Sequence, residues 1–256
     1  PFCSRRCDYC SFATWTDRHH LIDQYLAACK QQVNKWIEEL PEITSVFIGG
    51  GTPNLVPAES LMNVLAELPL VEGAEFTVEC NPDLVNFEQI ECYRQGGVNR
   101  ISLGVQSMVP EVLASLGREH NPDNVYSATE QIRSVGLSNI NFDLIYGAKG
   151  ESLEDWHTSL DLALSLAPQH LSAYALTVDP GTPLAEDASR HPEDDDQAEK
   201  YLIAEELLVE AGYSNYEISN WAQPNSECQH NLLYWNQGEY LGLGVAAHSH
   251  IAHKRF

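Results

Sequence analysis

The chain has 256 residues, of which 14 are basic and 37 acidic, so its formal net charge is −23. So negative a surface repels nucleic acid and anionic lipid, which argues against both as main partners. No stretch approaches the about 18 consecutive apolar residues that a membrane span needs. With 43% hydrophobic residues the chain can form a packed core, and its length suits one large domain or one domain with a small appendage.

The first feature along the chain is a group of three cysteines, Cys3, Cys7 and Cys10, out of seven in all. Disulfides between such close neighbours would be strained, and seven cysteines in this length are too few for a disulfide scaffold. A reducing cytoplasm is therefore the expected compartment, where a tight cysteine group is more typical of a metal site. The chain opens at Pro1 without a targeting signal and stops at Phe256, so we expect it to be a fragment.

Short β-branched runs then alternate with amphipathic helix patterns. The predicted strands are 45–48, 75–79, 100–105, 140–145 and 171–176. The predicted helices are 21–37, 57–68, 86–96, 109–116, 122–135 and 152–166. This alternation predicts an α/β fold with a parallel sheet and right-handed crossovers. An open or closed (β/α) barrel suits the rhythm best, and a doubly wound sheet is the alternative.

The pattern changes near residue 177, where the segment 179–183 has turn chemistry. The acidic run 191–196 precedes another helix pattern, and we interpret its carboxylates as a helix cap and solvated face rather than as metal ligands. From Tyr213 onward the chain is aromatic and irregular. We therefore divide the chain into a barrel core, residues 1–176, and an extension, residues 177–256.

Glycines or polar residues follow four successive predicted strands. The loop Gly49–Pro53 follows the first strand, Glu79 ends the second, Gln106 follows the third, and Asp143 lies near the end of the fourth. Ligands of barrels and open α/β sheets bind at the carboxyl ends of the strands. A glycine loop also lets a ligand approach the backbone and offers N–H groups to an anion. One such strand end could merely start a loop, but four in succession indicate a binding site.

The cysteine group has the spacing C-x₃-C-x₂-C. A structural zinc site needs four ligands, typically from two separated pairs, and no second pair is present. Three thiolates in one loop suit a [4Fe–4S] cluster with one iron open to an exogenous ligand. Arg5 and Arg6 would help to keep these thiolates deprotonated and would offset the negative charge of the cluster.

These segments resemble a known family. Cys3–Cys10, with its aromatic Tyr9, resembles the cluster motif C-x₃-C-x-φ-C of the radical S-adenosylmethionine (SAM) superfamily, and Gly49–Pro53 resembles the loop that binds the SAM amino group. The branch that the chain resembles most holds HemN, the oxygen-independent coproporphyrinogen III oxidase, and the heme chaperones HemW. The further segments that carry this resemblance are 79–82, 100–107, 116–118 and 141–147.

The resemblance implies a partial (β/α)₆ radical-SAM barrel, whose first strand would precede Pro1, followed by the start of a C-terminal extension. It implies that Cys3, Cys7 and Cys10 bind three irons of a [4Fe–4S] cluster and that SAM chelates the fourth. The positions that match the SAM site of the family are Gly50, Gly51, Thr52, Glu79, Gln106, Arg118 and Asp143. Among them, Arg118 is suited to a carboxylate, and Asp143 to ribose hydroxyls or the adenine region.

Two segments favour the chaperone group within this branch. Cys10 is followed by Ser11-Phe12 and so lacks the additional cysteine of the oxidase, and His230–Trp235 matches the motif H-N-x-x-Y-W of HemW. His230 is a candidate heme contact, because imidazole ligates iron and Tyr234 and Trp235 can stack on a porphyrin. A hydrogen-bonded histidine in an aromatic core is the alternative interpretation.

The resemblance thus implies a cytoplasmic heme chaperone that carries a [4Fe–4S] cluster and SAM and passes heme to acceptor hemoproteins, without coproporphyrinogen oxidase activity. An electron donor such as a flavodoxin or ferredoxin would be a further partner. Two alternatives stay open: a radical enzyme that oxidatively decarboxylates propionate side chains, and a simple iron–sulfur electron carrier. The carrier predicts no SAM site, which the four strand ends argue against.

Overall fold

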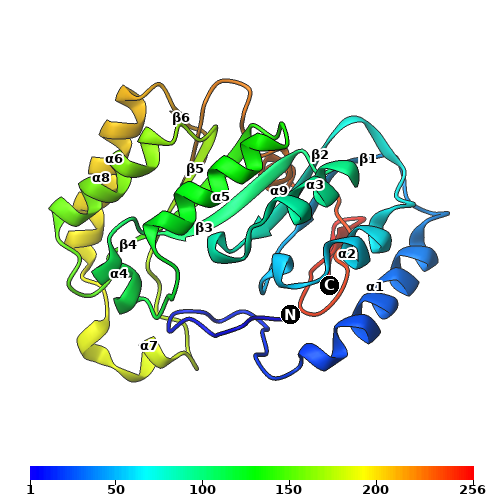
Figure 1. Cartoon of the computed structure of the whole chain (residues 1–256), viewed down its shortest axis with the longest axis horizontal. Coiled ribbons are helices and arrows are strands. Elements are labelled where there is room, and N and C mark those ends of the chain that lie inside the picture. The colour runs from blue at the N-terminus through cyan, green and yellow to red at the C-terminus, as the bar shows by residue number, and fades with distance from the viewer.

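Five parallel strands form the centre of the fold, and helices connect them in the order that the sequence predicts (Figure 1). A computed structural model describes residues 1–256. The parallel strands are β1 (Ile43–Ile48), β2 (Leu70–Cys80), β3 (Arg100–Gln106), β4 (Asn139–Tyr146) and β5 (His170–Ala175). The helices before and between them are α1 (Ile22–Trp36), α2 (Ala58–Leu65), α3 (Phe87–Gln95), α4 (Pro110–Ser115), α5 (Pro122–Ser134) and α6 (Leu153–Ser165).

After β5 the chain forms shorter elements around one long helix. They are α7 (Pro183–Glu186), α8 (Asp194–Glu210), β6 (Ser214–Asn215), β7 (Asn220–Ala222), α9 (Gln229–Trp235), β8 (His250–Ile251) and β9 (Lys254–Arg255). The segment from Tyr213 onward was expected to be irregular, but it contains elements of two to seven residues. They are too short to show a hydrophobic period in the sequence.

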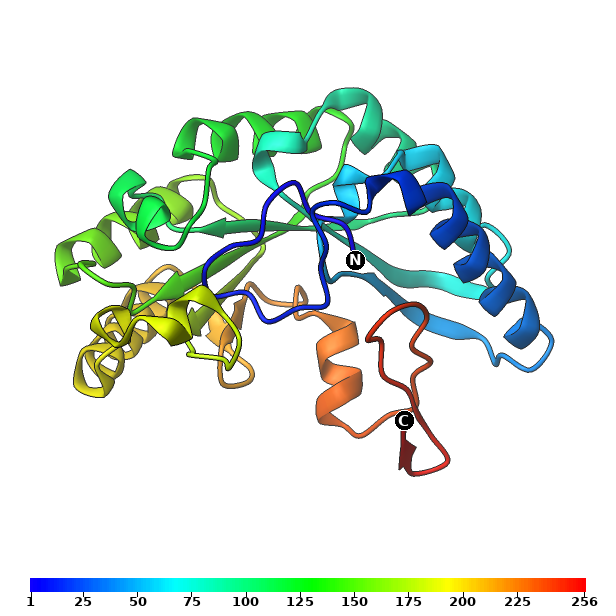
Figure 2. The same cartoon turned by 90° about the horizontal axis from the view of Figure 1, so that it is seen from below.

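The main sheet has the order β1-β2-β3-β4-β5-β7-β6, in which β7 and β6 are antiparallel to their neighbours. The sheet curls into a half-barrel, with α1 to α6 along its convex side and α9 and the last residues on the opposite side (Figure 2). This confirms the α/β class and the partial barrel. The division at residue 176 stays a prediction, since β7 of the extension pairs directly with β5 of the core.

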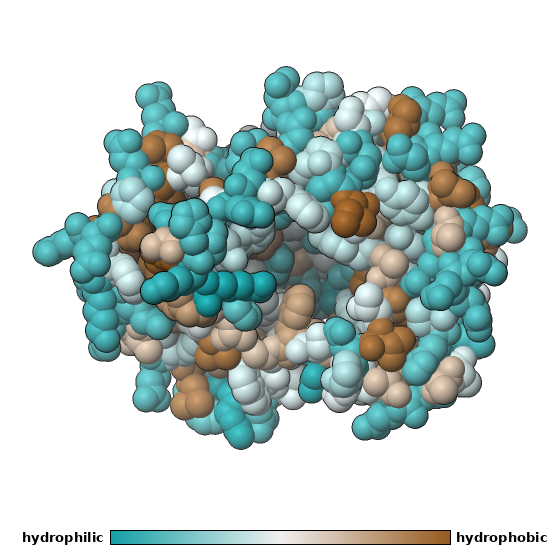
Figure 3. All heavy atoms as spheres, turned by 180° about the vertical axis from the view of Figure 1, so that it is seen from behind, coloured by the Kyte–Doolittle hydropathy of each residue, from teal (hydrophilic) through white to brown (hydrophobic).

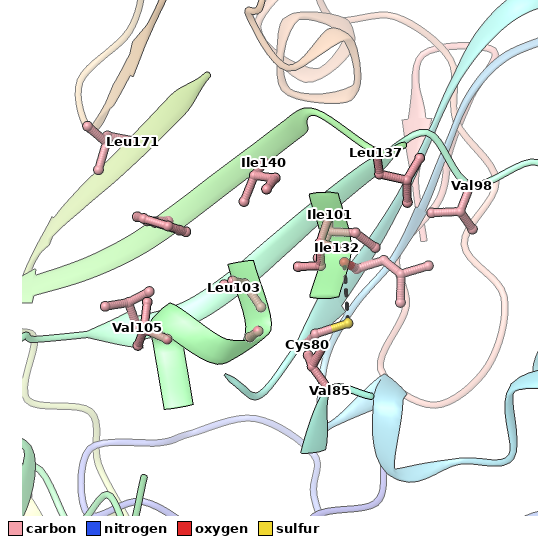
Figure 4. Packing of buried hydrophobic residues seen from close by; sticks show 14 of the residues in the cluster. Cys80, Val85, Val98, Ile101, Leu103, Val105, Ile132, Leu137, Ile140 and Leu171 are labelled. Carbon is pink, nitrogen blue, oxygen red and sulfur yellow. Dashed lines mark hydrogen bonds between the residues drawn. The ribbon is translucent and has the colours of Figure 1, made fainter. Parts of the chain in front are cut away.

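Side chains along each central strand alternate between two different environments. On the convex side, β3 presents Ile101, Leu103 and Val105, which are fully buried against helices such as α5 (Figure 4). On the inner side the same strand presents Arg100 and Ser102, both almost fully buried. The half-barrel therefore has an apolar outer core and a polar inner face, which is hollowed where the molecule is seen from behind (Figure 3).

The three aspartates of the acidic run lie in the first turn of α8, but no side chain caps the helix. Asp196 accepts a 2.7 Å hydrogen bond from Nζ of Lys200, whose side chain is completely buried. The same ammonium lies 3.2 Å from the buried carboxylate of Glu151, which precedes α6. This buried ion pair ties α8 to the loop that follows β4.

Helix α9 is anchored by a residue far away in the sequence. The buried carboxylate of Glu75, on β2, accepts hydrogen bonds from the backbone N–H groups of Gln229 (3.0 Å) and His230 (3.1 Å). A carboxylate at this end of a helix satisfies free N–H groups and interacts favourably with the helix dipole. Glu75 therefore fixes the start of α9 against β1 and β2.

None of the helices is both long and apolar enough to cross a membrane.

Candidate functional site

A cavity of about 450 Å³ opens at the carboxyl ends of the parallel strands. The loop that carries the three cysteines passes over these ends, between α7 and the start of α1 (Figures 1 and 2). The cavity is lined by every predicted cluster and SAM residue: Cys3, Cys7, Cys10, Gly50, Gly51, Thr52, Glu79, Gln106, Arg118 and Asp143. These residues come from the cysteine loop, from the ends of four different strands and, in the case of Arg118, from the loop between α4 and α5.

The cysteine loop is fixed to the glycine loop by close backbone contact. The N–H of Thr52 donates to the carbonyl of Phe2 at 2.7 Å, and the Thr52 hydroxyl donates to Sγ of Cys3 at 3.3 Å. A Cβ atom on Gly51 would lie 2.7 Å from the same carbonyl oxygen, so only glycine permits this approach. The glycine loop thus positions Cys3 directly.

Arg118 reaches the second cysteine from the other side of the cavity. Its Nη1 donates to Sγ of Cys7 at 3.5 Å, and its Nη2 donates to the Gly104 carbonyl (2.9 Å) and to Oδ1 of Asn81 (3.1 Å). Its Nε donates to Nδ1 of His120, whose Nε2–H donates to the Val105 carbonyl. The guanidinium is therefore held in one orientation, with a charged donor aimed at a thiol.

The two arginines beside the cysteines act on the thiols by their charge, as expected, but neither donates a hydrogen bond to a cysteine sulfur. Arg5 pairs with Glu119 at 2.6 Å on the surface, so it does not contact a thiol. Arg6 donates through Nε to the Cys10 carbonyl at 3.0 Å, and its charge lowers the pKa of that thiol. Burial outweighs this effect and raises the pKa of Cys10. The cation that contacts a cysteine sulfur is Arg118, which is distant in the sequence.

Two carboxylates lie on the inner face at the cavity. Asp143 accepts from the Ser102 hydroxyl at 2.7 Å and from Nδ2 of Asn141 at 2.9 Å. Glu79 accepts from the N–H of Gly50 at 3.0 Å. Burial and the negative charge of Asp143 raise the pKa of Glu79 to about 8, against the opposing effects of Gly50 and Arg100. Glu79 is thus largely protonated at neutral pH when the cavity holds no cation.

Gln106 reaches the cavity through an irregular backbone. The β3–β4 register shifts between Gly104 and Gln106, and Gln106 adopts a left-handed backbone with φ of 64°. A non-glycine residue in this region costs roughly 1–3 kcal/mol. Such a bulge redirects a side chain at the end of a strand. Here it directs the Gln106 side chain over Gly104, and a Cβ atom added to Gly104 would lie 3.1 Å from Nε2 of Gln106.

The donor set in the cavity fits an iron–sulfur cluster. All seven cysteines are free thiols, and three of them share this cavity with the hydrogen-bond donors of Thr52 and Arg118. No three potential ligands are grouped tightly enough to hold a single metal ion. A [4Fe–4S] cluster does not require this, because each thiolate binds a different iron.

His230 does not line this cavity and packs instead against Ser45 and Phe47 of β1. Its ring stacks on Phe47, with centroids 5.4 Å apart, and its two nitrogens contact the hydroxyls of Ser45 and Tyr234. The structure therefore does not bring the candidate heme contact together with the cluster and SAM positions.

Sequence reasoning missed two residues that organise the cavity, Asn81 and His120. The backbone of Asn81 exchanges two hydrogen bonds with the Asn54 side chain, and its own side chain accepts from Arg118. His120 orients the same guanidinium, and burial beside that cation lowers the pKa of His120 to about 4, so it stays neutral. Asn81 immediately follows the second strand, and this position is the signal that could have identified it.

Comparison with known proteins agrees with this geometry. Residues 1–163 match the family described as the Radical SAM superfamily. The chain is 38% identical to the heme chaperone HemW of Mycobacterium tuberculosis, with all of this chain and 69% of that protein covered. It is 37% identical to the heme chaperone HemW of Escherichia coli, with 98% of this chain and 68% of that protein covered.

The coproporphyrinogen III oxidase HemN from Escherichia coli, whose structure is described as that of a radical SAM enzyme, has a similar fold. The two superpose with a TM-score of 0.84 at 24% identity, over 97% of this chain and 62% of the HemN chain. This likeness concerns the fold, and the chain spans less than two thirds of that neighbour.

Proposed function

The chain belongs to the radical SAM superfamily and, within it, to the HemN/HemW branch, and from this premise we propose that it is a heme chaperone. It holds a [4Fe–4S] cluster on Cys3, Cys7 and Cys10, binds SAM beside the cluster, and carries heme to acceptor hemoproteins. The observation that supports this proposal most strongly is that three free thiols and all seven SAM positions line one cavity. Its relatives at 37–38% identity are named heme chaperones.

When bound, a cluster with one open iron supplies an electron and a chelation site for the amino and carboxylate groups of SAM. The residues of the chain would hold these groups in place. Gly50, Gly51 and Thr52 offer backbone to the methionine part, since a loop without large side chains permits close approach. Glu79 would hold the amino group, and a nearby ammonium would favour the ionised form of this carboxylate.

Arg118 and Asp143 would bind opposite ends of the SAM molecule. Four of the five N–H groups of Arg118 already donate to Cys7, Asn81, Gly104 and His120. The fifth, on Nη1, is free to donate to the SAM carboxylate. Asp143 lies across the cavity with two lone-pair directions for ribose hydroxyls or the adenine region. Tyr9 and Tyr174 line the same cavity.

The heme would bind at the extension rather than in this cavity, with His230 as its contact. Tyr234 and Trp235 follow His230 one turn further along α9 and are 47% and 54% exposed, so both rings are available to a porphyrin. The free thiols are consistent with action in a reducing compartment, and we propose the cytoplasm. A flavodoxin or ferredoxin would reduce the cluster.

Oxygen-independent coproporphyrinogen III oxidation is the second candidate, and the fold of HemN favours it. Two sequence features argue for the chaperone instead: the motif His230–Trp235 and the absence of a further cysteine after Ser11. A simple electron carrier would not need a cavity lined by the seven SAM positions.

The test uses the full-length protein, anaerobically reconstituted with iron and sulfide. Hemin is titrated into it and followed by its Soret band, and the loaded protein is then mixed with an apo-hemoprotein. The chaperone predicts saturable binding of one heme and transfer to the acceptor. Decarboxylation of coproporphyrinogen III under reducing conditions with SAM would instead establish the oxidase, and failure to bind hemin would refute the chaperone.

A further inference from the structure

The imidazole of His230 is held on three sides. Phe47 of β1 stacks against one face at an interplanar angle of 25°, and Nδ1 lies 2.9 Å from the hydroxyl of Ser45 on the same strand. On the outer side, Nε2 lies 2.8 Å from the hydroxyl of Tyr234. Tyr234 is four residues further along α9, so the two side chains share one face of the helix. Helix α9 contacts β1 and lies on the inner side of the sheet (Figure 2).

The protonation states of His230 and Tyr234 follow from their surroundings. Burial keeps the pKa of His230 below its ordinary value, against the opposing charge of Glu75, so the ring is neutral at pH 7. Burial raises the pKa of Tyr234, so its hydroxyl keeps its proton. A neutral imidazole has one N–H and one lone pair. Both tautomers of His230 can satisfy these two contacts, and iron binding through Nε2 needs the one with the proton on Nδ1. In that tautomer Nδ1–H donates to Ser45 and the Tyr234 hydroxyl donates to Nε2.

We propose that the hydroxyl of Tyr234 is a latch on His230, which occupies the iron-binding lone pair of Nε2 in the heme-free protein and turns away when heme binds. Ser45 complements it, because it holds the proton on Nδ1 and so keeps the lone pair on the outer nitrogen. This inference rests on the proposed role of His230 as the heme contact.

The two hydroxyls differ in their freedom to move. Ser45 is part of β1, where the parallel ladder with β2 fixes its backbone. Tyr234 is 47% exposed near the end of a seven-residue helix, and its ring makes edge-on contacts with the rings of His230 and Tyr240. Nδ1 faces the sheet, so Nε2 is the nitrogen that iron can reach. A metal-bound histidine commonly donates its other N–H to an acceptor that fixes its tautomer, which is the role left to Ser45.

The latch predicts opposite effects for the two hydroxyls. Tyr234→Phe keeps the ring for stacking but removes the competing hydrogen bond, so hemin should bind roughly 2- to 12-fold more tightly, the equivalent of one neutral hydrogen bond. Ser45→Ala leaves Nδ1–H without its acceptor and should weaken hemin binding by a similar factor. Tyr240→Phe is the matched control, since its hydroxyl does not contact His230, and should leave the affinity unchanged.

The experiment titrates the reconstituted full-length protein and these variants with hemin and, separately, with metal-free protoporphyrin IX. Protoporphyrin has no iron to ligate, so Tyr234→Phe should not change its affinity, whereas a general change in packing would affect both ligands. His230→Ala should abolish the shift of the hemin Soret band. Thermal unfolding of each variant checks that it is folded.

Three results would overturn the latch. If Tyr234→Phe bound hemin no more tightly than the wild type, while His230→Ala still gave no Soret shift, the latch would be refuted and the heme chaperone would stand. Unchanged hemin binding by His230→Ala would place the iron ligand elsewhere and would again refute the latch alone. A wild-type protein that binds no hemin would refute the chaperone and the latch together.

Discussion

Nη1 of Arg118 lies 3.5 Å from Sγ of Cys7, so a guanidinium held by buried partners is aimed at one of the three thiols that would carry the cluster. The two residues are 111 positions apart in the chain. Arg118 also donates to Gly104 and Asn81, which lie at the ends of neighbouring strands. The contact therefore joins the cysteine loop to the strand ends at which SAM would bind.

The first prediction concerns this contact. Arg118→Lys keeps the charge, but a single ammonium cannot replace the planar guanidinium, which donates four hydrogen bonds. We expect the unfolding free energy of the apo protein to fall by roughly 1.5–3 kcal/mol for each charge-assisted bond that is not replaced, and SAM binding to weaken. Urea unfolding and SAM titration measure both. Arg5→Lys, at a surface pair with Glu119, is the control and should change neither.

A second prediction tests the backbone contact under Cys3. In Gly51→Ala the new methyl group would lie 2.7 Å from the Phe2 carbonyl oxygen, and the cysteine loop would have to move. We expect a stability loss of about 1–3 kcal/mol and markedly less iron after reconstitution. Gly73→Ala has no neighbour within 4 Å but a positive φ of 78°, so it should lose about 1–2 kcal/mol and retain its iron. Equal iron contents in the two variants would contradict the account.

The third prediction is a pH dependence from Glu79. Its pKa of about 8 in the folded protein exceeds the ordinary value of 4.5, so the folded state holds a proton that the unfolded chain releases. The stability of the SAM-free apo protein should therefore decline as pH rises from about 4.5 to about 8. In Glu79→Gln, which can still accept from Gly50, this decline should be smaller.

Thermal unfolding between pH 6 and pH 9 measures the slope attributed to Glu79. Glu88→Gln, at an exposed position of α3, serves as the control and should keep the slope of the wild type. The account fails at this point if Glu79→Gln and Glu88→Gln have the same pH profile.

The sequence was sufficient for the parts of the fold that follow a local pattern. Alternation of strands and helices predicted the parallel sheet because each element is long enough to show its period. Gly50, Glu79 and Asp143 could be located at one edge because parallel strands deliver their carboxyl ends to the same side. Their roles in SAM binding stay predictions.

What the sequence could not predict depends on contacts between distant residues. No local pattern links Arg118 to Cys7 or Glu75 to the start of α9, and no pattern indicates that Lys200 is buried against Glu151. Nor did the sequence indicate that Glu119 pairs with Arg5, which acts on Cys7 by its charge and not by a hydrogen bond to the sulfur.

The fourth prediction uses the buried ion pair. Lys200→Met would leave the carboxylate of Glu151 buried without its cation, which typically costs about 3–5 kcal/mol. In the double variant Glu151→Gln with Lys200→Met no buried carboxylate loses its cation, and only the partly exposed Asp196 stays unpaired, so part of the loss should be regained. Denaturant unfolding of the single and double variants measures this coupling. Additive losses would show that the two side chains stabilise the fold independently.

The most direct test of the central claim is electron paramagnetic resonance of the reconstituted, reduced full-length protein with and without SAM. The account predicts a [4Fe–4S]⁺ signal with about four irons per chain, a change in its g values when SAM is added, and loss of the signal in Cys7→Ser. A wild-type protein that assembles no cluster, or one whose signal ignores SAM, would contradict it.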